Sequence, residues 1–82
     1  MQTIYLYSTA GCHLCELARD IVSPLLDTNV IQLEQIDIAD SDELIERYGV
    51  RIPVLKSPLH DDELGWPFDT EQTIRFLARI IR

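Results

Sequence analysis

The chain has 82 residues, which corresponds to one small domain with a modest core, so we expect a single domain over residues 1–82. Its formal net charge is −7, because 14 acidic residues outnumber 7 lysines and arginines. Nucleic acids and anionic membranes both bind clustered basic residues, so we expect neither as a partner. The N-terminal residues contain no basic segment and no long apolar stretch, which predicts a cytoplasmic location without a signal peptide or transmembrane helix.

The first half of the chain predicts a strand, a helix and a second strand. Thr3–Tyr7 is apolar and rich in β-branched and aromatic residues, which is typical of a buried central strand. Val30–Ile38 predicts the second strand, and a change of phase in its hydrophobic alternation indicates a bulge or a later start. Between them lies a helix that Pro24 should end or kink. Its apolar residues have helical spacing and should face the core: Leu14, Leu17, Ala18, Ile21, Val22 and Leu25.

A second helix and a third strand should follow. Asp40 and Glu43 have the spacing of a capping box, and the helix should run to Tyr48 with Gly49 as its C-terminal cap. Arg51–Lys56 then predicts a strand with a proline near its start, where the missing N–H is tolerated.

The chain should close with a short strand and a third helix. The strand is expected near Glu63–Trp66. Asp69 is a good N-cap for the helix, with Gln72 in the reciprocal position. The expected inner face comprises Ile74, Leu77, Ala78 and Ile81, widened by Phe76 and Ile80.

The predicted order of elements is β-α-β-α-β-β-α. The opening β-α-β unit implies two parallel strands joined by a right-handed crossover, and the last two strands should form an antiparallel hairpin. We therefore expect an α/β fold with a mixed four-stranded sheet flanked by three helices.

Cys12 and Cys15, the only cysteines, lie where the first helix should begin. Residues three apart on a helix have Cβ atoms roughly 5–6 Å apart, which is compatible with a reversible disulfide. A disulfide that closes so short a loop stabilises the fold little, so the pair is better suited to chemistry. The reactive species is the thiolate, which a helix N-terminus favours. Cys12 should therefore attack a partner disulfide, and the more buried Cys15 should resolve the mixed disulfide.

Cys12-His13-Leu14-Cys15 combined with Ile52-Pro53, in this β/α order, resembles the thioredoxin fold. The compact length and the stretches Tyr48–Leu55 and Trp66–Asp69 resemble a small bacterial glutaredoxin-like family. The resemblance implies a glutaredoxin-type dithiol–disulfide oxidoreductase of cell redox homeostasis. Its substrates would be protein disulfides or glutathione-mixed disulfides, reduced through Cys12 and Cys15.

The same resemblance implies roles for four other residues. Pro53 would be a cis proline facing the cysteines, and Ile52 would offer its backbone groups to an extended substrate strand. Asp69 ends the segment where glutaredoxins hold the γ-glutamyl end of glutathione, so we expect it to bind substrate. Arg51 is the cation expected near the thiols. It would pair with a carboxylate of a peptide or glutathione, or else only balance the acidic surface.

Two alternatives remain open from the sequence. His13 would support the Cys12 thiolate if it is protonated, or it is a solvated side chain in the first helical turn. The rival function is a non-catalytic thioredoxin-fold module that docks a protein partner or binds a metal or an iron–sulfur cluster. One chain offers only Cys12, Cys15, His13 and His60 as N/S ligands, whereas structural zinc uses four, so we expect no metal site.

The expected cofactors and partners follow from the hypothesis that the chain is an oxidoreductase. We expect no tightly bound cofactor, with glutathione as a candidate co-substrate. The expected partners are protein disulfides or glutathione and a reductase system, and the chain is expected to be a monomer.

Overall fold

The strands and helices follow one another in the predicted order β-α-β-α-β-β-α. The computed structural model describes residues 2–27 and 29–80. Two short 3₁₀ turns, η1 and η2, follow α1 and β2. The elements are β1 (Gln2–Ser8), α1 (His13–Val22), η1 (Ser23–Leu25), β2 (Ile31–Asp37), η2 (Ile38–Asp40), α2 (Asp42–Tyr48), β3 (Val54–Ser57), β4 (Asp62–Gly65) and α3 (Thr70–Ile80).

The four strands form one mixed sheet in the order β2-β1-β3-β4. β1 pairs with β2 in parallel, whereas the β1–β3 and β3–β4 pairs are antiparallel. Val54, at the start of β3, lies opposite Tyr7, near the end of β1. The loop that precedes β3 and the loop that leads into α1 therefore meet at the same end of the sheet.

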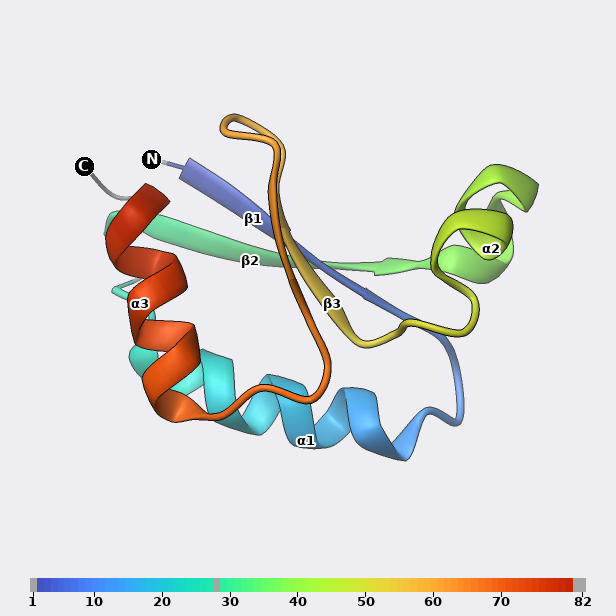
Figure 1. Cartoon of the computed structure of the whole chain (residues 1–82), viewed down its shortest axis with the longest axis horizontal. Coiled ribbons are helices and arrows are strands. Elements are labelled where there is room, and N and C mark those ends of the chain that lie inside the picture. Colours follow the sequence, from blue (N-terminus) through green and yellow to red (C-terminus); the bar gives the residue numbers. More distant parts are fainter. Residues whose placement is uncertain (1, 28, 81–82) are drawn as a thin grey trace.

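The helices bury the two faces of the sheet unequally (Figure 1). α1 and α3 lie along one face and form the larger core with it, whereas the shorter α2 covers one end of the other face, where a smaller core forms. Neighbouring residues on a strand point to opposite faces, so each strand can supply both cores. The larger core comprises Ile4, Leu6, Ala18, Val22, Ile31, Leu55, Phe68, Phe76, Leu77 and Ile80. The smaller one comprises Tyr7, Ile38, Tyr48 and Val54.

β2 is a regular strand that begins at Ile31, later than the predicted Val30. Its pairing with β1 is continuous over all seven residues, so the predicted alternative of a bulge is wrong. Leu33 packs against the larger core and Ile36 against the smaller one. The change of phase in the sequence therefore marks a strand that serves both cores.

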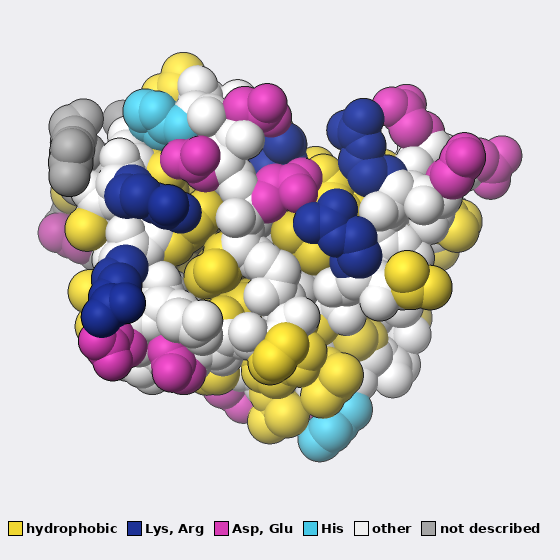
Figure 2. Space-filling model, viewed as in Figure 1, with side chains coloured by type: hydrophobic (Ala, Val, Ile, Leu, Met, Phe, Trp, Pro, Cys, Tyr) yellow, Lys and Arg dark blue, Asp and Glu magenta, His cyan; other side chains and the backbone are white. Residues whose placement is uncertain are grey.

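The buried stripe of α1 is narrower than predicted. Cys15, Ala18 and Val22 are buried, but Leu14 and Leu17 are 45% and 41% exposed, so their predicted core position was wrong. The helix meets the sheet through one stripe, which turns the neighbouring apolar stripe towards solvent. Figure 2 shows hydrophobic side chains gathered at the molecular surface on the α1 side.

α3 begins as predicted, and Phe76, Leu77 and Ile80 are buried as predicted, but the buried face is rotated away from Ile74 and Ala78. Asp69 and Gln72 exchange hydrogen bonds: the Asp69 N–H donates to Gln72 Oε1 at 3.0 Å, and the Gln72 N–H donates to Asp69 Oδ1 at 2.8 Å. The predicted inner positions Ile74 and Ala78 are exposed, because the helix is rotated to bury Thr73 together with three apolar residues. Ile81 lies outside the described residues. The buried face comprises Thr73, Phe76, Leu77 and Ile80.

The α2 region corrects two further boundaries. Ser41, and not Asp40, is the N-cap: its hydroxyl oxygen accepts a hydrogen bond from the Leu44 N–H at 3.3 Å. Gly49 is the C-cap, as predicted. β3 begins at Val54 instead of Arg51, because the preceding residues fold back onto the end of α2.

Candidate redox site

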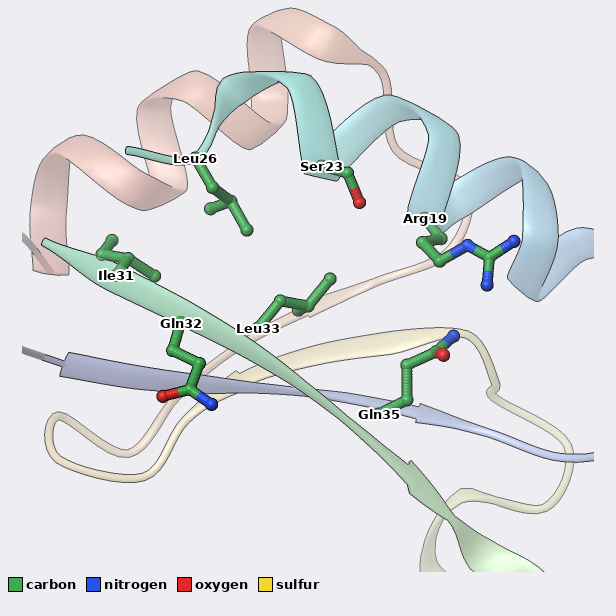
Figure 3. A pocket seen from close by; sticks show the side chains of 7 residues that line it. All are labelled: Arg19, Ser23, Leu26, Ile31, Gln32, Leu33 and Gln35. Atoms are coloured by element: carbon green, nitrogen blue, oxygen red, sulfur yellow. The ribbon is translucent and has the colours of Figure 1, made fainter. Parts of the chain in front are cut away.

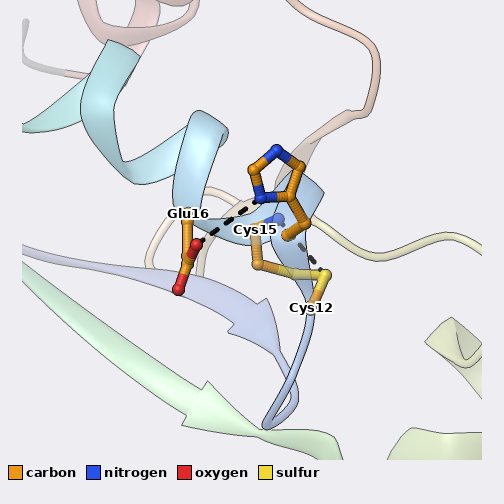
Figure 4. The surroundings of a disulfide bond; sticks show 4 residues. Cys12, Cys15 and Glu16 are labelled. Atoms are coloured by element: carbon orange, nitrogen blue, oxygen red, sulfur yellow. Dashed lines mark hydrogen bonds and ion pairs between the residues drawn. A yellow bond between two sulfur atoms is a disulfide. The ribbon is translucent and has the colours of Figure 1, made fainter.

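Cys12 and Cys15 form a disulfide at the start of α1, with their Cα atoms 5.2 Å apart (Figure 4). Gly11 has φ +77°, a left-handed conformation that glycine adopts without strain, and it turns the chain into the helix. Cys12 is the N-cap residue, and its Sγ accepts a hydrogen bond from the Cys15 N–H at 3.2 Å. Cys15 is only 3% exposed, whereas Cys12 is partly exposed. The pair therefore has one accessible sulfur at the helix N-terminus and one buried sulfur behind it.

His13 lies on the solvent side of this motif. Its Nδ1 is 3.7 Å from Glu16 Oε2, and both side chains are well exposed (Figure 4). An exposed pair of this kind contributes little to stability. His13 thus has a carboxylate neighbour, and its predicted support of Cys12 stays a prediction.

Pro53 is buried at the end of the sheet where the cysteine loop lies. The Ile52–Pro53 peptide bond is cis, as the resemblance implied, and the Trp66–Pro67 bond is cis as well. The Ile52 N–H donates to the Tyr48 carbonyl oxygen at 3.0 Å. Only the carbonyl of Ile52 therefore remains for the predicted bond to a substrate strand.

Arg51 is held by the rest of the protein. Its Nη2 donates to Glu63 Oε1 at 3.0 Å, and its guanidinium lies over the Tyr48 ring, 5.3 Å from the centroid. The other oxygen of Glu63 accepts a hydrogen bond from the Tyr48 hydroxyl at 2.5 Å and lies 3.6 Å from Lys56 Nζ. We call Tyr48, Arg51, Lys56 and Glu63 the Glu63 network. Arg51 thus has a carboxylate partner within this chain, and its predicted pairing with a carboxylate of a peptide or glutathione stays a prediction.

The Glu63 network shifts the acidity of its members. Hydrogen bonds from Tyr48 and Arg51 lower the pKa of Glu63 against the opposing effect of burial. Burial, followed by the bond to Glu63, raises the pKa of Tyr48. A hydrogen bond to Asp61 raises the pKa of Lys56. Glu63 is thus a carboxylate and Tyr48 a neutral phenol at neutral pH.

Asp69 is occupied as a helix cap. One side-chain oxygen accepts the Gln72 N–H, and the Asp69 carbonyl oxygen accepts the Thr73 hydroxyl at 2.8 Å. These bonds give Asp69 a structural role at the start of α3. Its predicted contact with glutathione stays a prediction.

The sequence interpretation missed Arg19. This residue and both cysteines line the same hollow of about 340 Å³, which lies between the β1–α1 loop, α1 and the end of β2. The sequence contained a signal for it: Arg19 follows Cys15 by four residues on a helix, and such residues have Cβ atoms roughly 5–6 Å apart. The cation that lines the hollow of the disulfide is therefore on the redox helix itself.

Two negative findings concern only residues 2–27 and 29–80. Within them, no three His, Cys, Asp or Glu side chains lie together in a way that could hold a metal ion. No helix there has both the length and the apolar composition needed to span a bilayer.

The fold and the cysteine pair together define the class of this protein: it is a redox module with a thioredoxin fold. The family model for the "Glutaredoxin-like domain (DUF836)" matches residues 3–78, and the chain belongs to this family.

Two solved structures of one bacterial protein are similar to the chain. The X-ray structure of Northeast Structural Genomics target protein XcR50 from X. campestris has a TM-score of 0.79 and 32% sequence identity, covering 93% of this chain and 96% of that one. Its solution structure has a TM-score of 0.78 at 32% identity, covering 96% and 95%. A comparison with curated proteins gave no match. The resemblance read from the sequence is thus confirmed for family and fold.

Proposed function

We propose that this chain is a dithiol–disulfide oxidoreductase that reduces protein disulfides or glutathione-mixed disulfides. One observation carries the proposal: the Cys12 sulfur occupies the N-cap of α1 and accepts a backbone N–H, while Cys15 lies buried behind it. In the reduced protein the same N–H and the helix dipole would stabilise a Cys12 thiolate. The accessible sulfur is then the nucleophile, and the buried sulfur is the resolving group.

The proposed reaction transfers two electrons in two exchanges. The Cys12 thiolate attacks one sulfur of the substrate disulfide, forms a mixed disulfide and releases the other sulfur as a thiolate, which takes up a proton. Cys15 then gives up its proton and attacks Cys12 Sγ, which releases the second substrate thiol and leaves the Cys12–Cys15 disulfide. The substrate is reduced and the protein dithiol is oxidised.

Regeneration of the dithiol requires an external reductant. Two molecules of glutathione or a dithiol reductase would supply the electrons, and a reducing compartment such as the cytoplasm favours that direction. We include in the proposal a cis Pro53 beside the disulfide and the free carbonyl of Ile52 as an acceptor for substrate backbone.

The test separates the two cysteines. Reduced wild-type protein should exchange with a small neutral disulfide such as 2-hydroxyethyl disulfide at neutral pH. Cys12→Ser should remove the exchange. Cys15→Ser should still perform the first attack but should accumulate the mixed disulfide, which mass spectrometry would detect as a protein heavier by one substrate thiol.

The control variant is His60→Gln, which changes a surface loop and should exchange like the wild type. Exchange that persists in Cys12→Ser would reverse the assigned roles. Wild-type protein that exchanges no faster than a free cysteine peptide would contradict the proposal itself.

A further inference from the structure

The disulfide opens onto a groove between α1 and β2, and this groove is lined by an arginine side chain that has no partner among the described residues. The hollow that contains the cysteines adjoins a second one of about 550 Å³, and Arg19 and Gln35 line both. We call the two together the α1–β2 groove. Figure 3 shows Arg19 extending from α1 towards the N-terminal part of the helix, above Gln35 from β2. The second hollow is lined by Arg19, Ser23, Leu26, Ile31, Gln32, Leu33 and Gln35.

Arg19 is the feature of this groove that needs a partner. Among the described residues, its guanidinium makes no ion pair and no side-chain hydrogen bond. The two carboxylates of the cysteine hollow have partners of their own: Glu16 faces His13 at 3.7 Å, and Asp37 accepts the Ala39 N–H at 2.9 Å. In the second hollow Arg19 is the one charged residue among polar and apolar side chains. Its chemical complement is a carboxylate, which guanidinium binds with two parallel hydrogen bonds.

The length of the groove selects the kind of ligand. Cys12 and Arg19 are seven residues apart, which is about 10 Å along a helix, or about three residues of extended chain. Leu26 lies seven residues further along the chain, beyond α1, on the apolar side of the second hollow. A tripeptide has two residue spacings, so with its sulfur at Cys12 it stops short of Arg19, whereas a segment of about six residues fills the groove.

We propose, on the basis of the function above, that the α1–β2 groove binds an extended polypeptide segment of the disulfide substrate. The segment has an acidic residue about three positions from its reactive cysteine, paired with Arg19. An apolar residue follows and packs against Leu26 and Leu33. The protein therefore recognises its polypeptide substrates through the α1–β2 groove, which lies on the side of the disulfide away from Pro53.

The test uses synthetic peptides whose single cysteine is a mixed disulfide with 2-thiopyridine, a neutral leaving group. Attack of Cys12 on the peptide sulfur releases 2-thiopyridone, whose absorbance reports the first exchange. One peptide pair has Glu or Gln three positions before the cysteine, and a second pair has them three positions after it. We expect reduced wild-type protein to prefer Glu over Gln by about three- to tenfold in one pair, as one charge-assisted contact predicts.

The variants assign this preference to one residue. Arg19→Gln should bring the Glu-to-Gln rate ratio close to one. Arg75→Gln removes the same charge from an exposed position on α3 and should keep the wild-type ratio. An Arg19→Gln ratio equal to that of the wild type, or no Glu preference in either pair, overturns the proposal. A preference for glutathione disulfide over all peptides also overturns it.

A binding measurement separates this inference from the oxidoreductase proposal. Fluorescence anisotropy with the oxidised protein uses the preferred Glu peptide with serine in place of cysteine. We expect Arg19→Gln to raise its Kd at least threefold and Arg75→Gln to leave it unchanged. Such a result with no exchange by the reduced protein would support the groove and contradict the oxidoreductase. Equal Kd values for wild type and Arg19→Gln would contradict the groove alone.

Discussion

The two sides of the disulfide differ in whether their arginine is paired with another residue of the protein. On the Pro53 side, Arg51 is bound by Glu63 and stacked on Tyr48. On the β2 side, Arg19 lines the groove without a partner among the described residues. An arginine that is expected near a redox site is thus not always available to a substrate, because the fold can supply its counterion.

The Pro53 side is built for rigidity. The Glu63 network joins residues from the end of α2, the loop before Pro53, β3 and β4. Tyr48 also stacks on Tyr7 of β1, with ring centroids 4.4 Å apart. On the β2 side, Arg19 and Gln35 line a hollow and make no side-chain hydrogen bond among the described residues, which leaves both side chains available to a ligand.

The largest expected effect is on stability when Glu63 is removed. Glu63→Ala leaves the Tyr48 hydroxyl and Arg51 without their acceptor, which should lower the free energy of unfolding by about 1–3 kcal/mol. Urea unfolding would measure it. Glu71→Ala is the matched control, since its pair with Arg75 is exposed and should contribute less than about 0.5 kcal/mol. Equal losses of unfolding free energy in Glu63→Ala and Glu71→Ala would mean that the Glu63 network stabilises the fold no more than an exposed ion pair does.

A smaller effect distinguishes the two arginines directly. Arg51→Ala should lower the free energy of unfolding by about 0.5–1 kcal/mol, because a partly exposed ion pair and a stacked contact are lost. Arg19→Ala should change it by less than about 0.5 kcal/mol, as expected for a side chain without partners. Thermal or urea unfolding of both variants checks this. A larger loss for Arg19→Ala would show that the groove arginine is structural.

The smallest expected effect is on how far the free energy of unfolding falls at acidic pH. The pKa of Glu63 is lower in the folded protein, so its contribution is fully present above the unfolded value of about 4.3 and is lost as pH falls through the folded value. Glu63→Gln, which keeps an acceptor for Tyr48, should therefore lose less stability than wild type between neutral pH and pH of about 3. Parallel pH curves for the two proteins would contradict this linkage.

Local patterns predicted the parts of the fold that depend on neighbours in sequence. The Asp69–Gln72 cap and the Gly49 C-cap lie at their predicted positions, because a cap is made by residues within one helical turn. The positions of Cys12 and Cys15 at the start of α1 follow from the same local spacing. Whether these cysteines exchange disulfides stays a prediction.

The errors about which helix faces are buried arose because a remote surface decided the outcome. Leu14 and Leu17 have the spacing of a buried face, but the sheet meets α1 along the stripe of Cys15 and Ala18. Ile74 is exposed for the same reason on α3. An amphipathic pattern gives the period of a helix, while its rotation is set by what it packs against.

The sequence by itself determined the order of the elements and the place of the cysteine pair, since both depend on residues close together in the chain. It also determined the family, because several short motifs occur in the right order along the chain. Tertiary structure alone decided that Arg51 has a counterion and that Arg19 has none among residues 2–27 and 29–80. Glu63 is twelve residues from Arg51 and reaches it only because β4 pairs with β3, whereas the β2 residues that line the hollows with Arg19 form no ion pair with it in the described part of the chain. The availability of a charge depends on partners brought by the fold, and residue spacing does not contain that information.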